Sequence, residues 1–574
     1  MRLHRLLFVA ATLAAACGCS YKPSPASGGN GDAVAPDLAI AAPDDGGIVA
    51  PGPSDGGDSD DLPSGEPITT APTLLLPGTA LYPRAIRLAV GARAGAVLAS
   101  VVTPLPSGRM GGTILRSDDD GLSFTEVGHI DDPVTSTGLC CATLFELPRA
   151  VGGLAAGTLL WAASVGGDTQ GQPMSIPVWS SADAGTTWTR LGTVVTAGKP
   201  RSSGGLWEPE FSVLADGTLV CHYSDETDPA HSQKLVEVRS SDGVTFGGAT
   251  NTVALAAAGA RPGMANVRRL PSGTYYMSYE ICGVAGDNCT AHLRTSADGW
   301  SWGDAADAGQ RPATVDGLHL AHAPTLVWNG TPGANGRFYL VGQMVYDGAG
   351  NVAPDNGAVL FANSEGGGRN WFEVPAPVPI GAPYDNFCPN YSSSILPLDG
   401  GQIGLELATQ WDGNVCRAWF ARGHLLGSGD ADGVASGGKY RLVNVMSGLC
   451  LDVSGGAATA GTKIEQWTCN GLTPQNWTFT VASDGSYALR AENSGLCLAV
   501  TAGATAAGAG IEQQPCDGSA PQRWTPRNVG RGYFVLGHAG LCLDDSGGST
   551  TAGTAMQLWS CNDLSPQIWH LEQS

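Results

Sequence analysis

Three glutamates in the middle of the chain have the side-chain chemistry needed to break a glycosidic bond. Glu208 and Glu210 share a Trp-Glu-Pro-Glu segment, and Glu280 ends a Ser-Tyr-Glu segment. Hydrolysis with retention of configuration needs two carboxyl groups about 5–5.5 Å apart, and inversion needs about 6.5–9.5 Å. One group stays protonated as the acid, while the other attacks the sugar or activates water. We therefore expect Glu208 and Glu280 to form the catalytic pair, with Glu210 as the rival for either role. Ion pairs with Arg261 or Arg84 are the structural alternative.

A repeated turn motif predicts the scaffold that positions these residues. Ser117 to Phe124 and Ser181 to Trp188 contain Ser, Asp, Gly, Ser or Thr, and an aromatic residue at fixed offsets. Shortened copies run from Ser240 to Phe246 and from Ser296 to Trp302, and a degenerate copy runs from Ser364 to Trp371. The motif resembles the Asp-box, a hairpin turn of the sialidase superfamily, in which Asp binds turn backbone and Gly supplies a left-handed residue. Repetition of the motif in five copies along the chain predicts an all-β fold with a β-propeller.

Residues 71–427 contain about six such periods, which predicts a six-bladed propeller of four-stranded blades. We expect the first strands to begin near Tyr82, Cys140, Trp207, Arg261, His322 and Asn390, and Thr73 to Leu76 to close the ring.

The start of a first strand and the end of a second strand meet at one face of an antiparallel blade. That face should carry Arg84, Glu208, Glu210, Arg261, His322 and Tyr391 from first strands, and Asp225, Glu280, Asp347 and Asp412 from second strands. Glu208 and Glu280 then lie on adjacent blades. Glu210 follows Glu208 by two residues, so on a regular strand both side chains point the same way.

Three segments resemble glycoside hydrolase family 93. They are Tyr82-Pro83-Arg84-Ala85-Ile86, Trp207-Glu208-Pro209-Glu210-Phe211 and Ser278-Tyr279-Glu280. That family consists of six-bladed propeller exo-α-1,5-L-arabinanases that retain configuration through two glutamates. The resemblance implies Glu208 as nucleophile and Glu280 as acid/base, with the reverse assignment left open. Arg84, Trp207, Arg261, His322 and Tyr391 are the substrate-binding candidates.

Two alternatives remain open. Tyr391-Ser392-Ser393 resembles the strand that carries the nucleophilic tyrosine of sialidases, and Arg84 resembles the first of their three carboxylate-binding arginines. However, residues 101–117 lack the Asp or Glu of a sialidase acid before the turn, and no convincing third arginine joins Arg84 and Arg261. A propeller that only binds glycan is the other alternative. We expect no metal or other cofactor, because His322 has no second ligand at a suitable spacing.

The last third of the chain repeats a Cys, Trp and Gln-x-Trp pattern three times, with the second repeat carrying Gln514 in place of the first Trp. The pattern resembles the ricin-type β-trefoil lectin, implied for residues 438–574 after a linker at 428–437. In that family an Asp and an Asn bind sugar hydroxyls beneath an aromatic platform. The implied sugar-binding residues are Asp452, Trp467 and Asn470 in the first repeat and Asp544, Trp559 and Asn562 in the third. The second repeat has Ala499 and Gln514, so we expect its site to be lost, while Trp477, Trp524 and Trp569 should lie in the core.

The cysteine spacing suggests a set of disulfides. Three pairs separated by 19 residues are expected in the trefoil: Cys450 with Cys469, Cys497 with Cys516, and Cys542 with Cys561. In the propeller, Cys282 with Cys289, Cys388 with Cys416, and the adjacent Cys140 and Cys141 are further candidates, which leaves Cys221 as a buried thiol. Spacing by itself does not prove connectivity.

The remaining features concern location and partners. The net charge of −22 excludes nucleic acid as a partner, because that would need clustered Lys and Arg. Residues 1–19 form an expected bacterial signal segment, with Cys17 as a candidate lipid-anchored residue, and residues 20–70 an expected disordered tether. We therefore expect a monomer that is secreted, or held at the outer surface as a lipoprotein, and that binds a polysaccharide.

Overall fold

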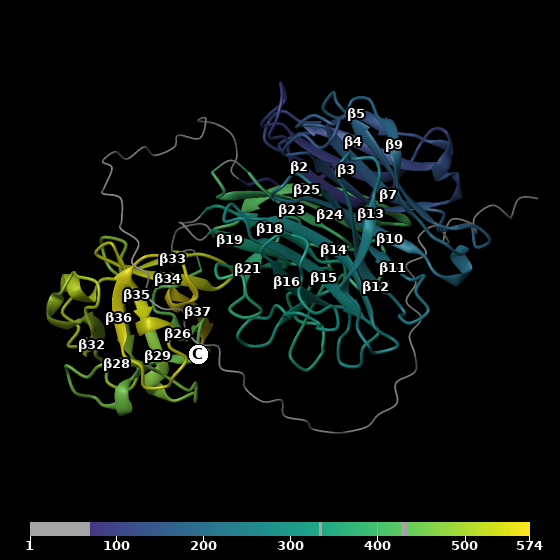
Figure 1. Cartoon of the computed structure of the whole chain (residues 1–574). Helices are drawn as coiled ribbons and strands as arrows, with labels where there is room; N and C mark the ends of the chain where they lie inside the picture. The colour runs from purple at the N-terminus through teal and green to yellow at the C-terminus, as the bar shows by residue number, and fades with distance from the viewer. Residues whose placement is uncertain (1–68, 332–335, 399, 428–430, 432) are drawn as a thin grey trace, which may run out of the picture. The chain divides into compact units, whose positions relative to one another are not determined.

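The computed structural model describes residues 69–331, 336–398, 400–427, 431 and 433–574, and nearly every regular element in them is a β-strand (Figure 1). The expected signal segment and nearly all of the expected tether lie outside these residues. The described helices are short 3-10 turns: Pro133–Thr137, Arg201–Ser203, Ser454–Gly456, Thr473–Gln475, Thr501–Gly503, Ala520–Gln522, Ser546–Gly548 and Ser565–Gln567. None of the described helices is long and apolar enough to cross a membrane.

The first three blades are four-stranded antiparallel sheets whose strands pair in chain order. Blade 1 contains β2 Leu81–Arg87, β3 Val97–Pro104, β4 Met110–Ser117 and β5 Thr125–Ile130. Blade 2 contains β6 Leu139–Glu146, β7 Leu159–Val165, β8 Ser175–Ser181 and β9 Thr189–Thr196. Blade 3 contains β10 Leu206–Val213, β11 Leu219–Asp225, β12 Lys234–Ser240 and β13 Gly247–Val253.

The last three blades complete the predicted six-bladed propeller. Blade 4 contains β14 Arg261–Arg269, β15 Tyr275–Cys282, β16 Thr290–Ser296, β17 His319–Ala321 and β20 Met344–Tyr346. Blade 5 contains β18 Thr325–Asn329, β19 Arg337–Val341, β21 Val359–Asn363 and β22 Phe372–Pro375. Blade 6 contains β23 Ser394–Pro397, β24 Ile403–Asp412, β25 Val415–His424 and β1 Thr73–Leu74.

Blade 4 departs from the expected four strands. Its third strand β16 has only an isolated bridge, Leu293 with Gln310, where a fourth strand is expected. The sheet is extended instead by β17 and β20, which pair with each other. The segment around His322 therefore follows a strand of blade 4, and the first strand of blade 5 begins three residues later than predicted, at Thr325.

The ring closes as the sequence predicts. Thr73 pairs with Phe420 and Leu74 with Trp419, so β1 is the outer strand of blade 6. The backbone N–H of Leu75 adds a hydrogen bond to the carbonyl of Ala418 at 2.9 Å, and the Leu75 side chain is buried. The first described segment thus joins the last blade to the first.

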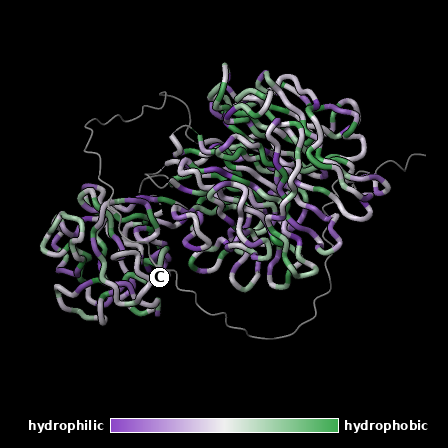
Figure 2. The backbone as a smooth tube through the Cα atoms, viewed as in Figure 1, coloured by the Kyte–Doolittle hydropathy of each residue, from purple (hydrophilic) through white to green (hydrophobic). Residues whose placement is uncertain are grey.

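The second strands explain the apolar composition. All seven residues of β7, Leu-Leu-Trp-Ala-Ala-Ser-Val, are buried. A strand covered on both sheet faces reads as a continuous apolar run instead of an alternating one. Figure 2 shows such hydrophobic stretches along the strands and hydrophilic residues in many of the connecting turns.

The turns after the third strands share one set of hydrogen bonds. In blade 3 the Ser240 hydroxyl accepts from the N–H of Gly243, and Asp242 accepts from the N–H groups of Val244 and Thr245. These backbone hydrogen bonds lower the pKa of Asp242. Equivalent bonds form around Asp119, Asp183 and Asp298. The carboxylates of these aspartates therefore bind the backbone of their own turns, and we give them no catalytic role.

The C-terminal region folds as a β-trefoil of twelve strands in one sheet. They are β26 Lys439–Asn444, β27 Cys450–Val453, β28 Ile464–Trp467, β29 Asn476–Val481, β30 Tyr487–Ala491, β31 Cys497–Val500, β32 Ile511–Gln514, β33 Thr525–Asn528, β34 Tyr533–His538, β35 Leu541–Asp545, β36 Met556–Ser560 and β37 Ile568–Gln573. Trp477, Trp524 and Trp569 are fully buried, and their indole N–H groups donate to the carbonyls of Leu451, Leu498 and Leu543. The three repeats therefore place equivalent tryptophans in the core, as predicted.

Removal of the closing strand should destabilise the propeller. A chain that begins at residue 77 lacks β1 and the buried Leu75, and a chain that begins at residue 69 keeps both. Loss of one large buried apolar side chain alone typically costs about 2–5 kcal/mol. We expect the shorter chain to unfold at a clearly lower temperature in circular dichroism or calorimetry. Equal unfolding temperatures for the two chains would contradict this role for β1.

Candidate active site and lectin sites

The first four blades start their first strands with the same irregularity. The pairing register shifts between Leu81 and Arg84 in blade 1, and at the equivalent points of blades 2, 3 and 4. Each bulge contains a residue with left-handed backbone: Tyr82, Cys141, Glu208 and Met264, with φ of 49°, 60°, 60° and 58°. Residues other than glycine rarely adopt this conformation, and such strain clusters at functional sites.

The bulge in β10 removes the regular alternation on which the expected shared direction of Glu208 and Glu210 rested, although both residues line the same pocket. Alternation of side chains assumes a regular strand, and the register shift between Trp207 and Glu210 removes that regularity. Glu210 accepts hydrogen bonds from Thr143 and Asn266 and forms an ion pair with Arg268 at 2.7 Å. It is nearly fully buried in these contacts. Glu210 is thus held as a structural carboxylate, which weakens it as a catalytic rival.

Glu208 reaches from blade 3 to the backbone of blade 4. Its Oε2 accepts from the Ser224 hydroxyl at 2.7 Å and from the N–H of Met264 at 2.8 Å. Gly263 makes this approach possible, because a Cβ there would lie 2.5 Å from the Gln233 amide and 3.3 Å from Glu208 Oε2. Burial raises the pKa of Glu208, and the hydrogen bonds from Ser224 and Met264 oppose that rise.

Glu280 lies on β15, opposite Gly263 of β14. The two residues are paired across β14 and β15, which brings Glu280 close to the strand that binds Glu208. Its Oε2 accepts from the N–H of Ala323 in the adjoining segment at 2.7 Å. Burial, reinforced by the negative charge of Glu208, raises the pKa of Glu280 to about 8. Glu280 therefore keeps its proton near neutral pH, as an acid catalyst must.

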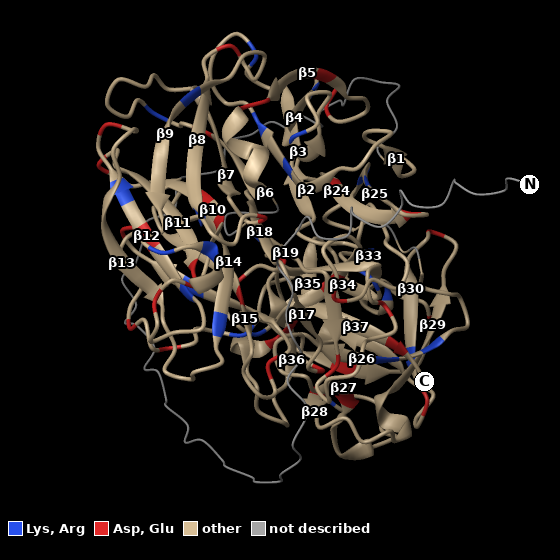
Figure 3. Ribbon diagram, turned by 90° about the vertical axis from the view of Figure 1, so that its right-hand side faces the viewer, with Lys and Arg blue, Asp and Glu red and all other residues tan. Residues whose placement is uncertain are grey.

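The structural alternative of ion pairs with Arg261 or Arg84 is not what the described residues show. Arg261 pairs with Glu226 and also donates to Gln233 at 2.7 Å. Arg84 donates to the carbonyls of Pro83 and Ser392, both at 2.9 Å. Both glutamates of the candidate pair thus stay outside the ion pairs of the described chain. The colouring of Figure 3 marks the acidic residues of β10 and the basic residues of β14.

Three other substrate-binding candidates have different surroundings from those expected. The Trp207 ring is buried, with the Arg201 guanidinium 4.8 Å from its centroid, so it belongs to the core and offers no sugar platform. Tyr391 is also largely buried, edge-on to Tyr82, with its hydroxyl 3.5 Å from the sulfur of Met264. His322 lies beside the Glu280 site, and its Nδ1 is 3.8 Å from Asp385.

The predicted convergence of second-strand aspartates is not observed. Asp225 accepts from Thr227, Asp347 accepts from Asn351 in its own exposed turn, and Asp412 pairs with Arg417 across its hairpin. These contacts are local, so only Glu280 among the second-strand carboxylates joins the site.

A narrow pocket lies beside Glu208. Its lining comes from the first strands of blades 1 to 4 and from the residue just before β18: Tyr82, Arg84, Cys141, Glu208, Pro209, Glu210, Met264, Ala265, Asn266 and Pro324. The candidate site is thus built where first strands of different blades converge.

The predicted disulfides are all present, and those of the propeller lie close to the site. Cys282 pairs with Cys289 at the end of the strand that carries Glu280, and the Cys289 carbonyl accepts from the N–H of His322. Cys140 pairs with Cys141, which lines the pocket. The third pair, Cys388 and Cys416, joins the entry of blade 6 to β25. Cys221 is buried and is the free cysteine of the described residues.

A possible metal cluster of Cys282, Cys289 and His322 does not fit the chemistry of its donors. The two sulfurs are bonded to each other, so neither is available as a thiolate ligand. The three residues lie together because the disulfide packs closely against His322.

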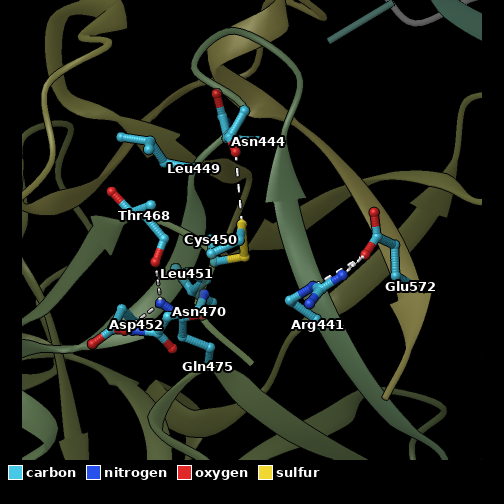
Figure 4. The surroundings of a disulfide bond; sticks show 12 residues. Arg441, Asn444, Leu449, Cys450, Leu451, Asp452, Thr468, Asn470, Gln475 and Glu572 are labelled. Carbon is cyan, nitrogen blue, oxygen red and sulfur yellow. Dashed lines mark hydrogen bonds and ion pairs between the residues drawn. A yellow bond between two sulfur atoms is a disulfide. The ribbon is translucent and has the colours of Figure 1, made fainter. Parts of the chain in front are cut away.

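The trefoil shows two equivalent candidate sugar sites, of which Figure 4 shows the surroundings of the first. Asp452 accepts from the Gln475 amide at 2.7 Å, and Gln475 also accepts from the N–H of Asn470. In the third repeat Gln567 makes the same bonds to Asp544 and Asn562. The platform rings Trp467 and Trp559 are 43% and 44% exposed, in contrast to the buried core tryptophans.

The second repeat lacks this arrangement. Its Gln522 donates only to the Pro515 carbonyl, because Ala499 offers no carboxylate. Gln514 replaces the aromatic platform and hydrogen-bonds Glu512 instead. The repeat keeps the fold and lacks the groups that would hold a sugar.

Sequence reasoning missed the groups that hold the catalytic candidates. These are Ser224, Gly263 and the backbone N–H groups of Met264 and Ala323. Backbone donors leave no signal in a sequence. The glutamines that position Asp452 and Asp544 did have a signal, since each opens a Gln-x-Trp motif.

Comparisons with known proteins agree with both folds. The ricin-type beta-trefoil lectin domain family matches residues 438–569. Among solved structures, the Penicillium chrysogenum alpha-L-arabinanase complexed with arabinobiose is 26% identical, with a TM-score of 0.53, covering 62% of this chain and 99% of that one. The glycoside hydrolase family 93 alpha-L-arabinofuranosidase of Fusarium graminearum, also with arabinobiose, is 23% identical, with a TM-score of 0.51 and the same coverage. The propeller therefore resembles family 93 arabinanases. A search of curated protein sequences found no match.

The raised pKa of Glu280 predicts a pH-dependent effect of Glu280→Gln on stability. The folded protein holds this proton up to a pKa of about 8, while the unfolded chain loses it near pH 4.3. Rising pH therefore destabilises the wild type through Glu280, and glutamine removes that cost. We expect Glu280→Gln to raise the unfolding temperature by a few degrees at pH 9 and to change it little at pH 5.

Thermal unfolding of wild type and variant at both pH values measures this difference. Glu126→Gln is the matched control, because Glu126 is an exposed carboxylate whose ion pair with His129 lies at the surface. Its effect should be small at both values. An effect of Glu280→Gln that is the same at pH 5 and pH 9 would be inconsistent with a protonated Glu280.

Proposed function

We propose that this protein is a retaining, exo-acting glycoside hydrolase that cleaves an arabinan-like polysaccharide, and that its trefoil binds glycan. The observation that carries the proposal is the proximity of two carboxyls with different surroundings, the partly buried Glu208 and the buried Glu280, on adjacent blades. The structural similarity to family 93 arabinanases supports the substrate class. A secreted or outer-surface location fits the six disulfides, since such bonds persist in oxidising compartments.

The two glutamates take different roles because their hydrogen bonds differ. Glu280 holds a proton and donates it to the glycosidic oxygen as the bond breaks. Glu208 is stabilised as a carboxylate by Ser224 and Met264 and attacks the anomeric carbon. Glu280, now ionised, then takes a proton from the water that hydrolyses the covalent intermediate. The Ala323 N–H stabilises Glu280 in this ionised state.

A sialidase is the second candidate, and the arginines weigh against it. Sialic acid carries a carboxylate that sialidases bind with three arginines. Here Arg261 and Arg268 are neutralised by Glu226 and Glu210, and Arg84 bonds backbone carbonyls. An acid-rich site with its arginines already paired favours a neutral sugar over an anionic one.

The trefoil serves as a two-site glycan anchor in this proposal. Each site combines an exposed tryptophan with a fixed Asp and Asn, which suits the apolar face and the hydroxyls of a sugar. Two modest sites on one chain raise the effective concentration of polymer near the propeller. The middle repeat contributes stability to the fold.

Product analysis on linear α-1,5-arabinan tests the catalytic proposal. Wild type should release an arabinose disaccharide from chain ends, whereas Glu280→Gln should lose about 10²- to 10⁴-fold in kcat because the acid is gone. Glu208→Gln should lose at least as much, because no covalent intermediate forms. Debranched arabinan and sialyllactose serve as comparison substrates, and Glu126→Gln as the matched control.

Chemical rescue by azide distinguishes the nucleophile from the acid/base residue. With Glu208→Ala, azide replaces the nucleophile and should give a glycosyl azide of inverted configuration, while Glu280→Ala should give the retained product. The opposite pattern would exchange the assignments. Free sialic acid from sialyllactose would favour the second candidate. Inertness on every glycan with binding retained would leave a non-catalytic lectin-like protein.

The lectin prediction concerns the two exposed tryptophans. Trp467→Ala and Trp559→Ala should each weaken binding to the polysaccharide, and the double variant should lose about 10²-fold or more of the avidity. Affinity electrophoresis or pull-down with insoluble polysaccharide measures this loss. Gln514→Ala in the second repeat is the control and should bind like wild type. A double variant with unchanged binding would contradict the two-site anchor.

A further inference from the structure

The propeller carries one strongly exposed aromatic ring in its described residues. Tyr384 is 52% exposed, and the comparable aromatic rings of the described chain are Trp467 and Trp559, the proposed sugar platforms of the trefoil. Sugar C–H faces pack well on such exposed rings. Tyr384 is therefore a candidate binding residue that the catalytic pair does not use.

The segment around Tyr384 is held at the face that carries the candidate site. Asn356 donates to the Pro383 carbonyl at 2.9 Å, which fixes the start of the segment. Gln343 donates to the carbonyls of Asn386 at 2.5 Å and Pro389 at 2.8 Å, which fixes its end. Gln343 follows β19, the second strand of blade 5, so it marks the same face as Glu280 at the end of β15. Both ends of the segment are thus anchored, and its middle residues face outward.

Asp385 ties this segment to the catalytic acid. Its carboxylate lies 3.8 Å from Nδ1 of His322, whose neighbour Ala323 donates its N–H to Glu280. The charge of Asp385 contributes to the raised pKa of Glu280. The Asp385 side chain is half exposed, so it keeps acceptor positions for a ligand.

We propose that Tyr384, Asp385 and His322 form a subsite for the sugar on the leaving-group side of the cleaved bond. This inference rests on the proposed function, because it assumes that Glu280 protonates the bond beside the subsite. The Tyr384 ring packs against the apolar face of the sugar, and Asp385 and His322 bind its hydroxyls. The ligand is a neutral sugar residue of the polysaccharide, because Asp385 adds negative charge where an acidic sugar would bring more.

The test compares two substrates that differ on the leaving-group side. An α-1,5-arabino-oligosaccharide places a sugar in the subsite, whereas an aryl glycoside of the same non-reducing end places a phenol there. We expect Tyr384→Ala to lower the ratio of kcat/KM for the oligosaccharide to kcat/KM for the aryl glycoside by about 3- to 10-fold, the size of one stacking contact. Asp385→Ala should lower the same ratio, and Tyr384→Phe should restore it.

Val244→Ala is the matched control, since Val244 is an exposed apolar residue in the turn between β12 and β13, on the opposite face. An unchanged ratio in both Tyr384→Ala and Asp385→Ala, with Glu208→Gln inactive on both substrates, would overturn the subsite and leave the proposed function standing. If wild type cleaves neither substrate, the proposed function fails. Calorimetric binding of the oligosaccharide then decides the subsite alone, in a background of Trp467→Ala and Trp559→Ala that silences the lectin. Weaker binding with Tyr384→Ala supports the subsite, and equal binding refutes it.

Discussion

One type of hydrogen bond underlies the candidate site. Its donor is the N–H of a residue with left-handed backbone at the start of a blade, and its acceptor is a side chain on the second strand of the preceding blade. In blades 2 and 3 the acceptors are hydroxyls: Ser164 accepts from Glu208 N–H at 3.0 Å, and Ser224 accepts from Met264 N–H at 3.3 Å. In blade 4 the equivalent acceptor is Glu280, which accepts from Ala323 N–H. At one repeated structural position, a glutamate in place of a serine thus puts the carboxyl of the candidate acid at a joint between blades.

The same joint explains why the two carboxyls differ. Glu208 occupies the left-handed position itself, so its side chain extends toward the next blade and meets the Met264 N–H beside Gly263. Glu280 projects from the following strand into a more buried setting with a single backbone donor. Burial favours the neutral acid, and each donor favours the carboxylate, so the second donor opposes the effect of burial more strongly at Glu208 than the single donor does at Glu280. The difference in surroundings is therefore a difference in the number of donors that contact each group.

The candidate sugar-binding sites and the candidate catalytic pair lie in different parts of the chain. The trefoil has two candidate sites with exposed tryptophans, while the propeller buries Tyr82, Trp207 and Tyr391 around its pocket. The disulfides follow the same division. Those of the trefoil are one per repeat, whereas the propeller pairs lie at strand ends near the candidate site. The Cys282–Cys289 link holds the Cys289 carbonyl that accepts from the N–H of His322, next to the Ala323 N–H that contacts Glu280.

The sequence alone determined both repeat architectures and the closing strand, and it offered the disulfide pairs and, through the family resemblance, Glu208 and Glu280 as candidates. These features depend on residue type and regular spacing, which a sequence records directly. Tertiary structure decided what spacing could not: the bulge that separates Glu210 from Glu208, the burial of Trp207 beneath Arg201, and the extra strands of blade 4. It also decided which backbone donors face the carboxyls. Backbone groups are the same in every residue, so their placement emerges only when strands from different blades meet.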